Sequence, residues 1–75
     1  MQITAIQLLT FTHSLVVKIK TGLELSRNAT SFRSQYKSAR GLNRNAKPIE
    51  VLQDVAQLYR ENGWDIPSVA HPYLS

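Results

Sequence analysis

Cysteine is absent from this sequence. The chain therefore has no disulfide framework, no thiolate nucleophile and no cysteine-based zinc site, and it fits a reducing compartment such as the cytoplasm, where we expect it. Histidine is scarce too, because His13 and His71 lie far apart and neither has an acid at a metal-binding spacing. There is also no Ser-His-acid arrangement and no glycine-rich phosphate loop. The sequence thus predicts no enzyme, no catalytic residue, no cofactor and no metal site.

A long hydrophobic run is also missing. The first seventeen residues carry no charge, but they begin without a basic region and contain several Thr and Gln residues. A membrane-spanning helix needs about 20 predominantly apolar residues. We therefore expect neither a signal peptide nor a membrane span, and no membrane partner.

Turn-forming residues are rare in the first forty residues, which contain no proline and a single glycine. This scarcity argues against a series of short strands. A β-hairpin remains an alternative for residues 15–25, where apolar residues alternate around Thr21-Gly22. Apolar residues also recur at heptad spacing, however, and this favours a first helix over about residues 3–40 that ends at Gly41. Thr21-Gly22 and the Ser, Asn and Thr residues of 26–30 are two points where this helix is expected to break.

A second, clearer helix is predicted over about residues 48–62. Pro48 suits the first helical position, where its missing N–H would have no partner, and Glu50 places negative charge near the positive end of the helix dipole. Gly63 follows as a left-handed stop. Trp64 is then placed to fold back on the last helical turn.

These elements predict an all-α fold, a helical hairpin with a long or broken first helix and a shorter second one. We assign residues 1–66 to a single small helical domain and residues 67–75, which contain two prolines, to an extended C-terminal tail. A chain of 75 residues is near the size at which one core leaves only ~3–5 kcal/mol of net stability. We therefore expect a homodimer that completes its core through one face of the first helix. This candidate dimer face consists of Leu8, Phe11, Leu15 and Ile19.

Acidic residues are missing from residues 27–47, which hold six Arg or Lys residues and dominate the net charge of +4. On a helix, side chains at i, i+4 and i+7 lie on one face, so most of these cations form a row. This row is the candidate site for an anionic partner, and we call it the basic stripe. Its members are Arg33, Lys37, Arg40 and Arg44.

The basic stripe has two interpretations. It would gain affinity for phosphate groups by releasing counterions. The nearby side chains suited to stacking or base contacts are Tyr36, Asn43 and Asn45. Alternatively, Glu50 and Asp54 of the second helix face Lys37 or Arg40, and we favour this interpretation because no nucleic-acid motif accompanies the charge. We expect a small non-enzymatic protein-protein interaction or regulatory module that acts through helical faces, with nucleic-acid binding by residues 27–47 as the alternative.

Overall fold

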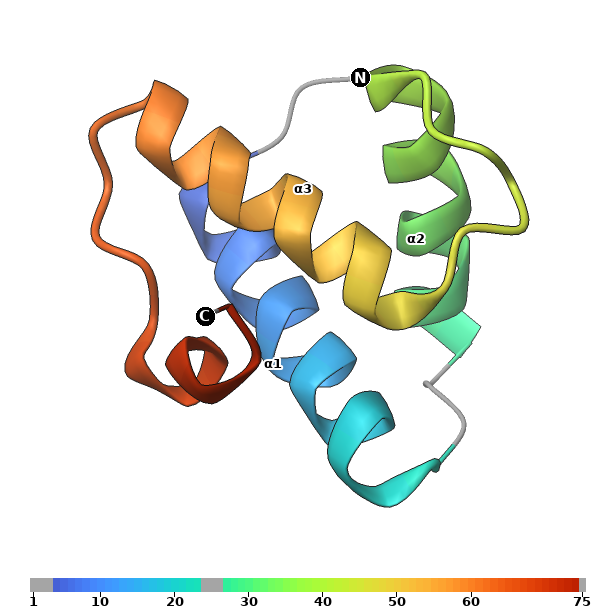
Figure 1. Cartoon of the computed structure of the whole chain (residues 1–75). Coiled ribbons are helices and arrows are strands. Elements are labelled where there is room, and N and C mark those ends of the chain that lie inside the picture. Colours follow the sequence, from blue (N-terminus) through green and yellow to red (C-terminus); the bar gives the residue numbers. More distant parts are fainter. Residues whose placement is uncertain (1–3, 24–26, 75) are drawn as a thin grey trace.

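The computed structural model of the chain describes residues 4–23 and 27–74. They form three α-helices, α1 (Ala5–Thr21), α2 (Arg27–Arg40) and α3 (Pro48–Glu61), followed by a 3-10 helix, η1 (Ser68–Tyr73). The described residues contain no strand, which confirms the all-α prediction. Helix α1 is central, because α2, α3 and η1 all pack against it (Figure 1).

Helix α1 begins and ends where its terminal backbone groups find partners. Thr4 Oγ1 accepts a hydrogen bond from the Gln7 N–H at 3.1 Å, and Gln7 Oε1 accepts one from the Thr4 N–H at 3.2 Å, which together form a capping box. Gly22 follows with a φ of 71°, and its N–H donates to the Lys18 carbonyl at 2.8 Å. Glycine adopts this left-handed conformation without strain, so the helix stops here. The predicted first helix is therefore broken at Thr21-Gly22, one of the two expected points.

The β-hairpin alternative is wrong for residues 15–21, which are α-helical. Leu15 and Val16 are both buried although they are adjacent, whereas a strand would direct them to opposite faces. Residues 24 and 25 lie outside the described residues. Because α1 and α2 are separate helices, the described residues form three packed α-helices, whereas the prediction was a helical hairpin with a long or broken first arm.

Helix α3 matches its predicted bounds closely. Pro48 occupies the first turn, and the Glu50 carboxylate accepts a hydrogen bond from the Lys47 N–H at 2.8 Å. After the helix, Gly63 has a φ of 68°, and the Trp64 N–H donates to a carbonyl of the last turn at 2.9 Å. The Trp64 ring then lies edge-on to Tyr59, with 5.8 Å between ring centroids. The predicted contact between Trp64 and the last helical turn is therefore confirmed.

The core lies between α1 and α3, with one side chain from α2 and one from η1. Ten buried side chains of the described residues make up this core. The members from α1 and α3 are Leu8, Phe11, Leu15, Val16, Val51, Leu52, Val55 and Tyr59, and the other two are Tyr36 and Ala70. Phe11 links α1 to α2, because its ring meets those of Phe32 and Tyr36 at centroid distances of 4.8 and 5.4 Å. The apolar faces of α1 and α3 that meet in this core are therefore covered within a single chain.

The C-terminal segment differs from the extended tail predicted for residues 67–75. Pro67 precedes a 3-10 turn that runs through Tyr73 and packs against α1. Ala70 is fully buried, and its N–H donates to the Pro67 carbonyl at 3.0 Å. A proline fixes a φ that suits the start of such a turn, and the small Ala70 side chain lets the turn approach the core closely. The segment is thus part of the domain.

This packing predicts that two neighbouring substitutions in η1 lower the free energy of unfolding by very different amounts. Ala70→Asp places an unpaired carboxylate in the core, so we expect the free energy of unfolding to fall by about 3 kcal/mol or more. Val69→Asp, at a site with 37% exposure, should change it by about 0.5 kcal/mol. Urea denaturation of both variants measures this difference. Equal midpoints for the two variants would show that η1 does not complete the core.

Candidate functional site

The basic stripe starts on α2 and continues into the loop that leads to α3. Arg33, Lys37 and Arg40 are on the helix, and Arg44 is on the loop. The structure does not leave all four side chains free for a partner. Lys37 and Arg40 are committed to contacts within the chain, and Arg33, Lys37 and Arg44 line a surface pocket.

Arg40 is committed to α3. Its Nε donates to Asp54 Oδ2 at 2.9 Å, and its Nη1 lies 3.4 Å from Glu61 Oε2. The hydrogen bond to Asp54 is also the main reason that the pKa of Arg40 rises above its ordinary value. The predicted pairing of this cation with Asp54 is therefore confirmed. The other predicted acid, Glu50, caps α3.

Asp54 Oδ2 accepts a second hydrogen bond, from the Tyr36 hydroxyl at 2.6 Å. Tyr36 is fully buried, and this burial, followed by the bond to Asp54, raises the pKa of its phenol above the ordinary value. The carboxylate therefore joins two side chains of α2 to α3 at one oxygen atom. Tyr36 is inaccessible for stacking on a base.

Lys37 holds the loop between α2 and α3 through hydrogen bonds to its backbone. Its side chain is almost entirely buried, and Nζ donates to the carbonyl oxygens of Arg44 at 3.0 Å and Ala46 at 2.9 Å. Burial lowers the pKa of Lys37 below its ordinary value, and the positive charge of Arg33 lowers it further. Because Lys37 binds the backbone of Arg44, it fixes the position from which the Arg44 side chain extends.

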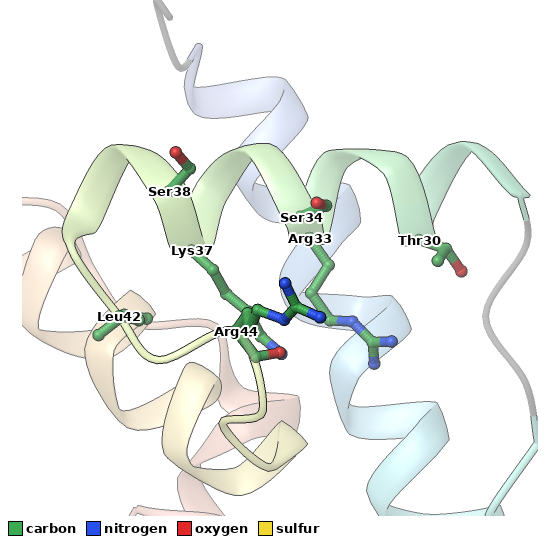
Figure 2. Close-up of a pocket in the computed structure, with 7 residues that line it drawn as sticks. All are labelled: Thr30, Arg33, Ser34, Lys37, Ser38, Leu42 and Arg44. Atoms are coloured by element: carbon green, nitrogen blue, oxygen red, sulfur yellow. The ribbon is translucent and has the colours of Figure 1, made fainter.

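Arg33 and Arg44 are the remaining members, and both line a pocket of about 460 Å³ (Figure 2). Figure 2 shows their side chains extending into the same region, one from α2 and one from the loop. Neither forms an ion pair with an acid among the residues that the structure describes. The full lining is Thr30, Arg33, Ser34, Lys37, Ser38, Leu42 and Arg44. We call this site the α2 pocket.

The lining also contains hydroxyl groups that the charge pattern did not identify. Thr30, Ser34 and Ser38 recur every fourth residue, so they lie along one side of α2 next to the cations. This spacing was visible in the sequence as a signal for one helical face. Of the two asparagines expected beside the site, Asn43 is used within the loop, where its Oδ1 accepts the Asn45 backbone N–H at 2.8 Å.

The candidate dimer face does not lie on the surface. Leu8, Phe11 and Leu15 are buried in the core of the single chain, and Ile19 is half-buried against it. The dimer prediction assumed that one chain could not cover this face, and that assumption is wrong because α3 and η1 cover it. The apolar side chains that α1 exposes are on its other side. They are Ile6, Leu9 and Val17, with exposures of 78%, 49% and 41%.

Comparison of this chain with protein-family models, with curated proteins and with solved structures gave no match. The site is therefore interpreted from its own chemistry. In the described part of the chain, no helix is long and apolar enough to cross a membrane. No group of three or more His, Asp or Glu side chains gathers there in a way that could hold a metal ion.

Burial of the Tyr36 phenol, together with its hydrogen bond to Asp54, predicts a loss of stability at alkaline pH. The unfolded Tyr36 phenol titrates at its ordinary pKa of 10.0, whereas the folded one keeps its proton to higher pH. This contribution to stability is therefore fully present below about pH 10 and is lost as the pH rises above it. We expect the stability difference between wild type and Tyr36→Phe to shrink by up to about 1.4 kcal/mol per pH unit in that range. Urea denaturation between about pH 8 and pH 11 tests this, and a constant difference would contradict the assignment.

Proposed function

We propose that this chain is a small non-enzymatic protein-protein interaction module that binds an acidic segment of its partner at the α2 pocket. One observation carries the proposal: Arg33 and Arg44 lack acidic partners within the described residues and line one pocket. A guanidinium group offers five N–H donors in a planar fork that matches a carboxylate or phosphate group. Two such groups can bind an anionic side chain, because Arg33 is on a helix that packs on α3 and Arg44 is on a loop that Lys37 holds in place.

The geometry of the basic stripe favours a protein partner over a nucleic acid. Binding along a nucleic-acid backbone depends on many phosphate contacts, and each contact makes the binding constant fall more steeply with salt. Here Lys37 and Arg40 are held by contacts within the chain, so the row of cations is interrupted. The buried Tyr36 ring offers no stacking surface. Nucleic-acid binding by residues 27–47 is the alternative function, and its support is the excess of positive charge in that segment.

The proposal assigns binding and no bond-making step to the pocket. Its described lining consists of two arginines, one lysine, three hydroxyl side chains and one leucine. A general base is usually a His, Asp or Glu within hydrogen-bond reach of the reacting group, and none is part of this lining. Hydroxyl and guanidinium groups are instead suited to holding an anion. The cytoplasmic location expected from the sequence stays a prediction.

The proposed function predicts that an acidic peptide binds through Arg33 and Arg44. We expect Arg33→Ala and Arg44→Ala each to weaken binding of a labelled glutamate-rich peptide by about tenfold, as loss of a charge-assisted contact implies. Arg60→Ala is the matched control, because it removes the same charge from an exposed site on α3 outside the pocket. It should change binding by less than about twofold. Fluorescence anisotropy gives the dissociation constants.

Two results of this experiment would contradict the proposed function. Equal losses in all three variants would show that binding follows net charge and not the pocket. Sub-micromolar binding of mixed single-stranded DNA or RNA, with a steep decrease as salt rises, would instead support the nucleic-acid alternative.

Homodimerisation remains a prediction, and we assign it to the exposed stripe of α1 formed by Ile6, Leu9 and Val17. Residues 5–17 carry no charge, so two copies can bring this stripe together without like-charge repulsion. Contact between two copies would also remove these apolar side chains from water. The assignment replaces the dimer face predicted from the sequence, which is buried within the chain.

Leu9→Asp tests this assignment. We expect it to convert a dimer into a folded monomer, because it places a charge at the exposed stripe and leaves the core intact. Leu15→Asp is the contrasting variant, because the same change at a fully buried site should unfold the chain. Sedimentation and circular dichroism distinguish the two effects. A wild type that sediments as an 8.5 kDa monomer at high concentration would rule out the dimer.

A further inference from the structure

We infer that the α2 pocket binds a phosphate monoester, carried by a phosphorylated side chain of the partner protein. This inference rests on the proposed function and names the chemical group that the pocket takes.

The pocket concentrates positive charge without a matching acid in its lining. Arg33, Lys37 and Arg44 all line it. Arg33 and Lys37 are close enough that the charge of Arg33 lowers the pKa of Lys37. Glu50 acts on Lys37 in the opposite direction, but it is outside the pocket and caps α3 through its bond to the Lys47 N–H. A bound anion would therefore relieve repulsion that Glu50 compensates only in part.

Lys37 adds a second observation, which is independent of the two arginines. It is 8% exposed, and two of its three ammonium hydrogens are donated to loop carbonyls. Nζ forms no third hydrogen bond to the described residues. The ammonium is only part-buried and Lys37 lines the pocket, so its third donor is available to a group bound there. An anionic oxygen in the pocket is the acceptor best suited to this position.

A phosphate monoester satisfies this set of donors better than a carboxylate does. It carries a charge of about −1.5 to −2 at neutral pH and has three strong acceptor oxygens. Two guanidinium forks and one ammonium can therefore share it, and Ser34 and Ser38 supply hydroxyl donors beside them. A carboxylate has two oxygens and a single charge, and one arginine fork already occupies both oxygens.

The test compares three versions of one labelled peptide in which a central residue is phosphoserine, glutamate or serine between neutral residues. We expect the phosphoserine peptide to bind at least about tenfold more tightly than the glutamate peptide, because it offers an extra acceptor and extra charge. Arg33→Ala and Arg44→Ala should abolish this preference, and Arg60→Ala should preserve it. Arg44→Lys should reduce it as well, because lysine keeps the charge but loses the planar fork.

A pH profile and a competitor separate phosphate recognition from general attraction. The second pKa of the phosphate is about 6, so the preference for phosphoserine over glutamate should fall between pH 7.5 and about pH 5.5. Inorganic phosphate should displace the phosphoserine peptide, and chloride at equal ionic strength should do so less well, because chloride has a single charge and no acceptor oxygens. These measurements use the full chain.

Each outcome decides between the two proposals. Equal binding of the phosphoserine and glutamate peptides would overturn the phosphate inference and leave the proposed function standing. Absence of binding by all three peptides would overturn both. Tighter binding of single-stranded RNA or DNA than of the phosphoserine peptide would overturn the inference in favour of the nucleic-acid alternative.

Discussion

The arrangement of α2 depends on the Asp54 carboxylate. One oxygen of this side chain accepts hydrogen bonds from the Tyr36 hydroxyl and the Arg40 guanidinium, and so it joins two points of α2 to the middle of α3. Tyr36 also packs on Phe11, which connects the same contact to the core on α1. These bonds determine which side of α2 faces the protein. The side that carries Arg33 is consequently left at the surface, next to the loop that carries Arg44.

A charged helix face can therefore contain cations with different roles. In α2, Arg40 stabilises the packing of the helix on α3, and Lys37 stabilises the loop through two carbonyl oxygens. Arg33 and Arg44 form no ion pair with the acids of the described residues, and together with Lys37 they line the α2 pocket. The net charge of the segment thus overstates the charge available for binding. A localised anionic group fits this distribution better than a long polyanion, and this is the physical basis of the proposed function.

The sequence was sufficient for the helices and insufficient for their packing. The positions of Pro48 and Gly63 predicted α3 closely because these residues act on local backbone geometry. Gly22 marked one of two possible breaks for the same reason. The burial of Leu8 and Leu15 depends on the packing of α1 against α3 and η1, which lie more than thirty positions further along the chain, so a periodic pattern identified an apolar face but not its partner. The prolines of the C-terminal segment suggested an extended chain, whereas burial of Ala70 favoured a compact turn.

The candidate site was predicted in part. The pairing of Arg40 with Asp54 followed from the matched spacing of cations and acids on two helices. The use of Lys37 to hold loop carbonyls has no signature in the sequence, because any carbonyl can accept and the loop conformation was unknown. The hydroxyl row of α2 was visible as a spacing of four residues. The spacing did not show that these hydroxyl groups line a pocket, because the pocket also depends on the loop that carries Arg44.

The central claim is that the basic stripe is divided into internal cations and binding cations. Nuclear magnetic resonance of the arginine side-chain Nε–Hε groups tests it most directly, because each arginine gives its own signal during titration with the phosphoserine peptide. The account predicts that the signals of Arg33 and Arg44 shift with the same dissociation constant while that of Arg40 stays in place. A shift of Arg40 equal to the other two, or small shifts spread over all arginines, would contradict it.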